Sequence, residues 1–413
     1  MKRFAKDLKQ TDLINKFVTI DSVVGICSYF IYNKYSKYIG IITNTTVKEL
    51  SLTPSSTIEL IDMPETFPLS QVIGKGNKGT YKSGTDPEFF VEANEKIIPA
   101  FSFLGSKKEP KHLTPIKEMP VYWDGFQAEF ETQAQTCHGW SVDEIQRGLS
   151  TLLAAAKTVD KDAIISTKTL IQVTQEQLDN ALPEHKAFGC MPSFNAYDMK
   201  GLSLPGEICP CRSAGGHIHM GMGEQTEASA IPVVKMLDNI LGITGVSCFA
   251  KYDDPRRRRM YGLAGEYRLP KHGIEYRVLS NAWMFHPLTA NIFLDLARIV
   301  WYAFEYNIKL NWVGNEEETI HIINNCDVKG ARYVMERNKD LLLNILNACY
   351  LNQSKAKMVY EILLTGADAF VTDNIQENWK LNGGWIGHSD GKQANVNHYY
   401  NNIYTKQKLQ EVS

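Results

Sequence analysis

Three short segments between residues 215 and 283 place two polar side chains at positions i and i+2. On a β-strand this spacing puts both side chains on the same face of the sheet. The pairs are His217 with His219, Glu266 with Arg268, and Glu275 with Arg277. Imidazole, carboxylate and guanidinium groups on one face are costly to bury without partners. A metal ion together with a polyanionic ligand would satisfy all three, so the sequence predicts a sheet that lines a metal–phosphate site.

Two upstream segments add acidic side chains with the same spacing. Asp86 and Glu88 share a face of a strand expected near residues 86–91. A second acidic strand is expected over residues 121–131, where Glu129 and Glu131 share a face and Asp124 lies earlier on the same strand. The expected metal ligands are therefore mainly carboxylates, a hard set that suits Mg²⁺ or Mn²⁺ better than structural zinc. The six candidates are Asp86, Glu88, Asp124, Glu129, His217 and Glu275.

Four arginines supply planar groups that fit phosphate oxygens. They are Arg257, Arg258, Arg268 and Arg277. Each feature alone has an ordinary structural interpretation: a Glu-x-Arg pair is often a surface salt bridge, a His-x-His pair is often structural or binds zinc, and an arginine run is often a solvated face. Several such strands in one chain favour a joint role, since divalent metals and arginines on one surface are the parts of a phosphoryl-transfer site.

The composition limits the class of protein. The chain has 413 residues, of which 44% are hydrophobic and 22% charged, as in globular proteins with a substantial core. The net charge of −2 argues against a dedicated nucleic-acid binder. No apolar run approaches the roughly 18–20 residues of a membrane span, and no secretory signal is expected. Eight cysteines do not make a disulfide scaffold in a chain this long, and Cys209 and Cys211 are expected as reduced thiols, so we expect a soluble cytoplasmic protein.

The pattern of the chain predicts three parts. Residues 1–78 form a small β-rich module, with a helix or arm over 1–15, strands near 17–20, 25–32 and 38–42, and a Gly/Lys linker over 74–79. The linker lacks the GK[ST] ending of a phosphate-binding P-loop. Residues 79–290 form the main domain, and residues 291–413 form a helical extension with an irregular tail.

Helices are expected wherever apolar residues recur at helical spacing. In the main domain, Ser141–Glu144 reads as a capping box that opens a helix to about residue 156. Further helices are expected near residues 175–182, 231–241, 288–304, 316–324, 331–350 and 356–364. Candidate lid segments are the loops at 188–195 and 201–215.

Several segments resemble glutamine synthetase in the same order along the chain. The segment 84–90 (GTDPEFF) resembles GPEPEFF, residues 216–221 (GHIHMG) resemble its His-x-His-Met strand, and residues 274–277 (IEYR) resemble IEVR. The match is closer to the phage carboxylate–amine ligases of the phiEco32-like COOH·NH2 ligase type. It extends over FGC-x-P at 188–192, AGGHIHMG at 214–221, RR-x-x-YG-x-AG at 257–265 and GxEYRxLSNxW ending at Trp283, and so covers roughly residues 80–290.

The resemblance implies an α+β fold in which the concave face of an antiparallel sheet holds ATP and divalent metals. It implies a carboxylate–amine ligase, phage-encoded and acting in the host cytoplasm, that forms an acyl phosphate before an amine attacks. Its partners would be ATP, Mg²⁺ or Mn²⁺, a carboxylate and an amine that is a small molecule, peptide or protein. No nucleic acid or membrane is implied, and a homo-oligomer is among the expected assemblies.

The resemblance also implies residue roles. Glu88 and Glu129 resemble ligands of the metal beside the acyl phosphate, and Asp124 aligns more loosely with them. Asp86, His217 and Glu275 resemble ligands of the metal that bridges the ATP phosphates. The expected catalytic residues are Arg277, Arg268 and Glu129, and the expected nucleotide contacts are Arg257, Arg258, Arg277 and His219.

Two positions depart from these patterns. Asp86 replaces a glutamate, which shortens the ligand by one methylene group. Ser193 stands where the phage group has an aspartate, and this departure leaves open how the amine or carboxylate substrate is recognised. Three alternatives also remain: an ATP:guanidino phosphotransferase, which does not need the metal set; a metal-dependent hydrolase, which does not need the arginines; and a non-catalytic binding or virion protein that keeps the fold.

Overall fold

The computed structural model describes the greater part of the chain. The described residues are 2–4, 7, 17–20, 23–32, 38–43, 47–53, 55–60, 81–109, 120–136, 138–186, 193–197, 210–221, 223–305, 308–350 and 352–381. The predicted linker at 74–79, the motif at 188–192, most of the loop at 201–215, Cys209 and the tail after residue 381 lie outside this description.

The chain divides into two compact units. The first contains residues 1–78, 298–312 and 339–357, and the second contains residues 79–297, 313–338 and 358–413. The predicted domain boundaries at residues 78 and 290 stay a prediction.

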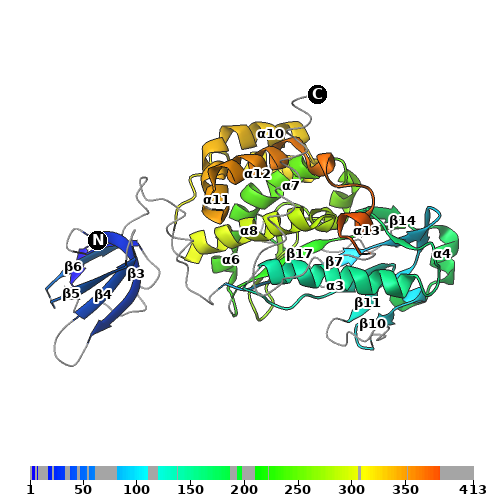
Figure 1. Ribbon diagram of the computed structural model, residues 1–413, viewed down its shortest axis with the longest axis horizontal. Coiled ribbons are helices and arrows are strands. Elements are labelled where there is room, and N and C mark those ends of the chain that lie inside the picture. The colour runs from blue at the N-terminus through cyan, green and yellow to red at the C-terminus, as the bar shows by residue number, and fades with distance from the viewer. Residues whose placement is uncertain are drawn as a thin grey trace. The chain divides into compact units, whose positions relative to one another are not determined.

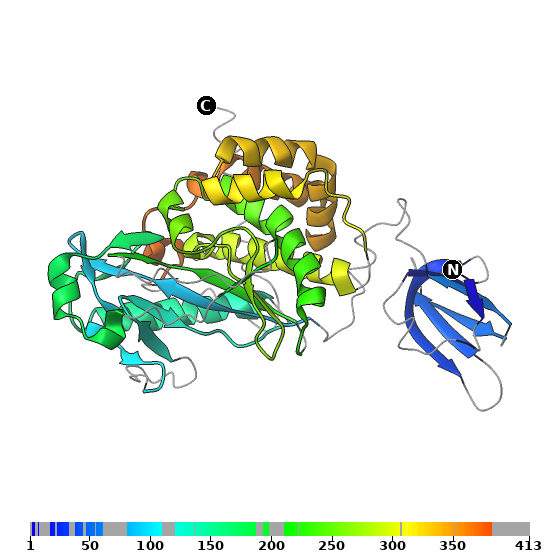
Figure 2. The same cartoon turned by 180° about the vertical axis from the view of Figure 1, so that it is seen from behind.

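A six-stranded sheet, with antiparallel pairing throughout, forms the N-terminal part of the first unit (Figures 1 and 2). Its strand order is β1-β6-β2-β3-β4-β5. The three predicted strands are present, but residues 2–4 form a strand instead of helix because they pair with residues 57–59. The strands are β1 (Lys2–Phe4), β2 (Phe17–Ile20), β3 (Val23–Tyr32), β4 (Tyr38–Thr43), β5 (Val47–Leu52) and β6 (Thr57–Leu60).

An eight-stranded sheet organises the second unit. Its order is β10-β11-β12-β7-β17-β19-β18-β15, and its pairs are antiparallel except for β10 with β11. Together with its flanking helices it confirms the predicted α+β class with a mainly antiparallel sheet. The strands are β7 (Ser83–Phe89), β10 (Gly105–Ser106), β11 (Val121–Asp124), β12 (Gln127–Phe130), β15 (Phe194–Asn195), β17 (Gly216–Met220), β18 (Glu266–Arg268) and β19 (Ile274–Tyr276).

Smaller strand pairs extend this unit. A three-stranded sheet joins β13, β8 and β9, and a two-stranded sheet joins β14 and β16. Their bounds are β8 (Val91–Ala93), β9 (Lys96–Ile98), β13 (Ile164–Ile165), β14 (Leu170–Gln172) and β16 (Cys211–Ser213).

The acidic segment at 121–131 is a hairpin and not the single strand that the sequence predicted. Strands β11 and β12 pair antiparallel, with Tyr122 opposite Glu129. The chain reverses at Gly125, whose φ of 62° lies in the left-handed region that glycine adopts readily. The reversal puts Asp124 and Glu129 on neighbouring strands, so both can face the same pocket.

Helix α3 (His138–Ala156) packs on the sheet beside β7 and β11 (Figure 1). Gly148 makes the close approach possible, because a Cβ there would lie 2.2 Å from the ring of Phe130. The helix begins three residues before the predicted capping box, so Ser141 is a buried residue inside it. The helix was predicted correctly to residue 156 and only its start was wrong, because the local Ser-x-x-Glu pattern carries no information about the hydrogen bond between His138 in the first turn and Asp295.

A continuous helical segment from Glu227 to Cys248 packs against β19. It consists of α6 (Glu227–Leu237), a π-helical turn (Asp238–Gly242) and α7 (Ile243–Cys248), and is longer than predicted. By length and composition alone this segment could cross a membrane, but 72% of its apolar 18-residue stretch is buried within the protein. Its apolar side chains therefore act as core residues of the second unit.

The remaining helices agree broadly with the predicted series. Two differences are that the predicted helix at 331–350 is broken at Asn338, and that a short helix occupies the start of the predicted irregular tail. Their bounds are α4 (Gln175–Asn180), α5 (Pro183–Lys186), α8 (Pro287–Glu305), α9 (Glu316–Asn325), α10 (Val328–Arg337), α11 (Lys339–Tyr350), α12 (Gln353–Thr365) and α13 (Ile375–Asn378).

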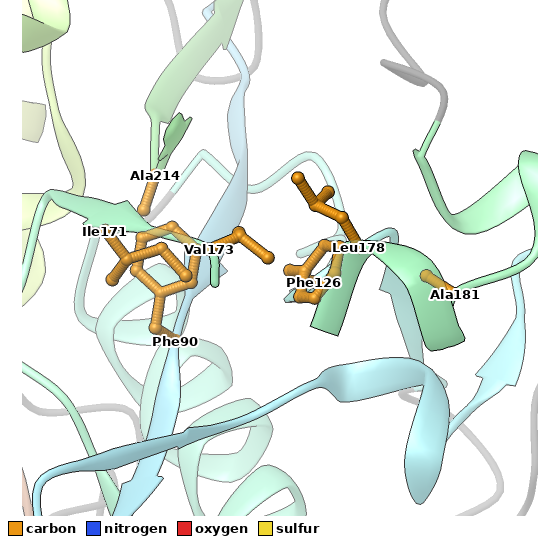
Figure 3. Close-up of a cluster of buried hydrophobic side chains, with 7 residues drawn as sticks. All are labelled: Phe90, Phe126, Ile171, Val173, Leu178, Ala181 and Ala214. Atoms are coloured by element: carbon orange, nitrogen blue, oxygen red, sulfur yellow. The ribbon is translucent and has the colours of Figure 1, made fainter. Parts of the chain in front are cut away.

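One hydrophobic cluster fixes the ends of the strands that carry polar residues (Figure 3). Phe90 follows β7, Phe126 lies in the turn of the β11–β12 hairpin, and Ala214 precedes β17. All three are fully buried, and burying one such aromatic side chain contributes about 1.5–3 kcal/mol. The cluster therefore holds the neighbouring Glu88, Asp124 and Gly215 in fixed relative positions.

Candidate active site

Strand pairing brings the predicted metal ligands of three segments together. In the register of β7 with β17, Asp86 lies opposite His217. In the register of β17 with β19, His219 lies opposite Glu275. Since alternate residues of a strand face the same side, Asp86, Glu88, His217, His219 and Glu275 share one face of the sheet. Residues of the opposite face, such as Phe89, Ile218 and Tyr276, are buried.

The first group of ligand atoms consists of Asp86, His217 and Glu275. His217 Nδ1 lies 3.1 Å from Asp86 Oδ1 and 3.5 Å from Glu275 Oε1. All three residues are buried, and one ligand atom of each lies within 4.8 Å of the others. Within the described chain, neither Asp86 Oδ1 nor His217 Nδ1 has a hydrogen-bond partner. These atoms converge as ligand atoms around a cation do, without satisfying one another by hydrogen bonds.

The second group consists of Glu88, Asp124 and Glu129, whose ligand atoms also lie within 4.8 Å of one another. Glu88 and Glu129 are opposite each other in the register of β7 with β12. The Gly215 backbone N–H donates to Glu88 Oε2 at 2.6 Å, and the Tyr122 hydroxyl donates to Glu129 Oε1 at 3.0 Å. Each glutamate thus keeps one carboxylate oxygen fixed by the protein.

The electrostatics of the two groups differ. Burial raises the pKa of Glu88 to about 7, with a further increase from Asp124. Burial and the neighbouring carboxylates also raise the pKa of Glu129 well above its ordinary value. Burial alone would raise the pKa of Asp86, but His217 and His219 hold it well below its ordinary value. Glu88 and Glu129 therefore bind protons more tightly than ordinary glutamates do, and a divalent cation would compete with those protons.

Arg268 and Arg277 both contact Glu275, but their surroundings differ. Arg268 donates two hydrogen bonds to this carboxylate, at 2.6 and 2.7 Å, and 28% of its side chain is exposed. Arg277 is fully buried: its Nε lies 3.1 Å from Glu275 Oε1 and its Nη1 donates to Ser193 Oγ at 2.6 Å. Ser193 thus contacts the site through Arg277.

Arg257 and Arg258, predicted as phosphate contacts, have protein partners in the structure. Arg257 Nε and Arg258 Nη2 bind the two oxygens of Asp253, at 3.3 and 3.0 Å. Both also donate to the Val278 carbonyl, at 2.6 and 2.7 Å. Both are buried, and in the described chain neither lines the pocket over the acidic groups. Their contacts hold the 3₁₀ turn Pro255–Arg259 against the chain that leaves β19.

Two pockets open over this face of the sheet. One, of about 480 Å³, is lined by both glutamates and Asp124 of the second group, by Asp86 and His217, by Lys107 and by Arg268. The other, of about 520 Å³, is lined by Lys82, Gly84, Thr85 and Met220 among others. Asp86, Glu131 and His219 line both, so the pockets adjoin at these residues. His219 lies at this junction, with Nε2 3.3 Å from Asp86 Oδ2 and Nδ1 3.0 Å from His272 Nε2.

Sequence reasoning missed residues that orient the predicted ligands. The Tyr261 hydroxyl lies 2.6 Å from His217 Nε2, the Tyr122 hydroxyl binds Glu129, and Asn281 Nδ2 donates to the Glu88 carbonyl at 2.8 Å. Tyr261 and Asn281 belong to motifs quoted above, the RR-x-x-YG-x-AG and GxEYRxLSNxW segments, but no local spacing pointed to their contacts. The role of Gly215 was also missed: a Cβ at this position would lie 2.6 Å from His217 Nε2, so the absence of a side chain leaves room for the imidazole.

The comparison with protein families bears on the part of the chain that contains β17, β18 and β19. Residues 207–381 match the family described as phage phiEco32-like COOH.NH2 ligase-type 2. The resemblance predicted from the sequence is thereby confirmed. The matched segment contains His217, His219, Glu275 and the four arginines, and it continues through the helices after Trp283, which the sequence resemblance did not reach. The upstream acidic residues lie outside it, so their grouping rests on the geometry alone.

Other comparisons add little. Among curated proteins, none matches this chain. A solved structure titled "Crystal structure of novel glutamine synthase homolog" is similar over 85% of this chain and 84% of its own, with 9% sequence identity and a TM-score of 0.36.

Proposed function

We propose that the protein is an ATP-dependent carboxylate–amine ligase that uses two divalent cations, Mg²⁺ or Mn²⁺. The supporting observation is the pair of adjacent ligand-atom groups on one face of the sheet, one of which takes His217 and Glu275 from the segment that matches the ligase family. We also propose, from the family's description, that the protein is phage-encoded and acts in the host cytoplasm. The proposal for the cations rests on the residues themselves.

The residues fit divalent cations in number and type. The first group offers two carboxylates and one imidazole, and the second offers three carboxylates. Oxygen-rich ligand sets of this kind suit Mg²⁺ and Mn²⁺. The buried Asp86 Oδ1 and His217 Nδ1, which lack hydrogen bonds in the described chain, are the atoms that a cation would satisfy. A bound cation would neutralise phosphate oxygens and so favour transfer of the phosphoryl group.

The two pockets suit two substrates whose reacting ends meet. We assign the nucleotide to the side of Asp86 and His219, and the carboxylate substrate to the side of Glu88, Asp124 and Glu129. In the first step a carboxylate oxygen attacks the γ-phosphorus of ATP and ADP leaves. In the second step the amine nitrogen attacks the carbonyl carbon of the acyl phosphate, and the amide forms as inorganic phosphate leaves.

The chain's own side chains serve both steps. Arg268 is the partly exposed arginine of the pocket, and it would stabilise negative charge on the transferring phosphoryl group. Arg277 would act through Glu275, which it contacts from the buried side. Glu129, once a cation at the second group has displaced its proton, would accept the proton that the attacking amine loses.

The test is ADP release from ATP with a panel of carboxylates and amines in Mg²⁺. We expect release to require a carboxylate and to stop in EDTA, and hydroxylamine to trap the acyl phosphate as a hydroxamate. A guanidino phosphotransferase or a hydrolase would form no hydroxamate. Full turnover in EDTA would contradict the proposal.

Glu88→Gln removes one candidate ligand while keeping the shape of the side chain, and we expect it to abolish hydroxamate formation. Glu92→Gln is the matched control, because Glu92 belongs to β8, pairs with Lys168 and is outside both ligand groups. If both variants lost hydroxamate formation equally, the loss would reflect a folding defect. Glu88 would then have no support as a metal ligand.

A further inference from the structure

The arginines of the 3₁₀ turn Pro255–Arg259 bind other groups of the protein, and the turn positions Tyr261, which lies two residues beyond it. The Asp253 and Val278 contacts of Arg257 and Arg258 fix this turn beside the exit of β19. The chain continues with a hydrogen bond from the Tyr261 backbone N–H to the Arg257 carbonyl at 2.8 Å. It then turns at Gly262, whose φ is 81°. The turn thus delivers Tyr261 to a fixed place at the edge of the first ligand group.

Tyr261 makes two contacts there with different parts of its side chain. Its hydroxyl lies 2.6 Å from His217 Nε2. Its ring lies under the guanidinium of Arg277, whose central carbon is 4.5 Å from the ring centroid. Arg277 in turn lies 3.1 Å from Glu275 Oε1. One side chain therefore contacts a candidate metal ligand directly and supports a second one through an arginine.

The hydroxyl contact bears on which nitrogen of His217 carries the proton when a cation binds. A neutral imidazole binds a metal through a nitrogen without a proton, while the other nitrogen keeps its N–H and needs an acceptor. His217 Nδ1 faces Asp86 and Glu275, so with a cation held between these groups the proton would be on Nε2, where the Tyr261 oxygen would accept it. Without that oxygen, a proton on Nδ1 would face Asp86, at 3.1 Å, and would occupy the position of the cation.

We propose that Tyr261 is a positioning residue that keeps His217 in the metal-binding tautomer and orientation and keeps Arg277 beside Glu275. The inference rests on the proposed function, since it assumes a divalent cation at Asp86, His217 and Glu275. It assigns to the segment 257–265 the support of the metal site and not the contact with phosphate that the sequence predicted.

Two substitutions separate the two contacts. Tyr261→Phe removes the hydroxyl and keeps the ring under Arg277. Tyr261→Leu removes both. Tyr252→Phe is the matched control, because the Tyr252 hydroxyl is also buried and bonded, to the Val371 carbonyl at 2.7 Å, but lies outside the ligand groups.

The measurement is Mn²⁺ binding to the full chain, followed by calorimetry and by the electron paramagnetic resonance signal of free Mn²⁺. We expect the wild type to bind two equivalents. In Tyr261→Phe, one equivalent should bind about 10–100-fold more weakly, the usual effect of losing a hydrogen-bond partner of a metal ligand. The other equivalent should be unchanged and serves as an internal control. Tyr261→Leu should weaken the same equivalent and lower the rate of ADP release below that of Tyr261→Phe.

The outcomes separate this inference from the proposed function. If the wild type binds two equivalents and Tyr261→Phe binds both with wild-type affinity, the positioning role is wrong while the ligase proposal stands. The same holds if Tyr252→Phe weakens Mn²⁺ binding as much as Tyr261→Phe. If the wild type binds no Mn²⁺, the metal site fails, and the role of Tyr261 fails with it. Should Tyr261→Leu not fold, Tyr261→Phe alone decides.

Discussion

Glu275 and Asp253 are both shielded carboxylates that hold two arginines each, with 2% and 9% of their side chains exposed. Asp253 uses one oxygen for Arg257 and the other for Arg258, and both arginines add hydrogen bonds to the Val278 carbonyl. Glu275 binds Arg268 and Arg277, but its Oε1 also lies 3.5 Å from His217 Nδ1, within a group of converging ligand atoms.

The difference shows how a structural cluster of charges can be told from a ligand-binding one. Around Asp253 both carboxylate oxygens are bonded, and the buried atoms of its two arginines that lack a hydrogen bond in the described chain, Arg257 Nη1 and Arg258 Nε, are nitrogen donors that cannot bind a cation. Around Glu275, in the described chain, Asp86 Oδ1 and His217 Nδ1 are buried with no hydrogen bond. Buried atoms of that kind require an explanation, and a cation supplies one.

The largest expected effect comes from exchanging each carboxylate for its amide. Glu275→Gln should weaken one equivalent of Mn²⁺ by at least the ~100-fold seen when strong partners of metal ligands are lost. Asp253→Asn should leave Mn²⁺ affinity unchanged and lower the free energy of unfolding by about 3–5 kcal/mol, because two buried arginines lose their counter-charge. Calorimetry with Mn²⁺ and urea unfolding measure the two quantities. If Asp253→Asn also lost Mn²⁺ binding, the two clusters would not be separable.

The arginines provide a second test with a smaller effect. Arg268→Lys keeps the charge but loses the planar donor pair, so we expect kcat for ADP release to fall by on the order of 10²-fold with little change in Tm. Arg258→Lys should do the reverse, lowering Tm with kcat preserved in the folded protein. Thermal unfolding and steady-state kinetics on both variants check this. A loss of kcat in Arg258→Lys without a change in Tm would return Arg258 to the phosphate contacts.

The smallest effect concerns pH. The pKa of Glu88 in the folded, metal-free protein is raised from 4.5 to about 7. A raised pKa means that the folded state binds the proton more tightly. The stability it contributes is fully present below pH 4.5 and is lost as the pH rises through about 7, with a slope of up to ~1.4 kcal/mol per pH unit.

Glu88→Gln should remove this part of the slope, and Glu92→Gln should not. Urea unfolding in EDTA between pH 5 and 8 measures it. A stabilising increment from Mg²⁺ that grows with pH should accompany it, because the cation displaces the proton. Parallel pH profiles for wild type and Glu88→Gln would show that Glu88 does not titrate in this range.

Much of the fold was predictable because periodicity is local. The period-two spacing of His217 and His219, and of Glu275 and Arg277, was enough to predict their strands and the face they share. The hairpin at 121–131 was not predicted, since its apolar and acidic residues fit one long strand until Gly125 reverses the chain. The capping box at Ser141 also predicted the wrong start for its helix, because a local pattern carries no information about neighbours in space.

The sequence by itself determined which residue types face the pocket, because the direction of a side chain on a strand depends only on its position in that strand. Tertiary structure alone decided which of them meet. The strand order puts Asp86 beside His217 across a separation of 131 positions, and it divides the acids into two groups. It also decided that Arg258 binds Asp253 while Arg268 lines the pocket, since a guanidinium takes whatever carboxylate the fold brings within reach.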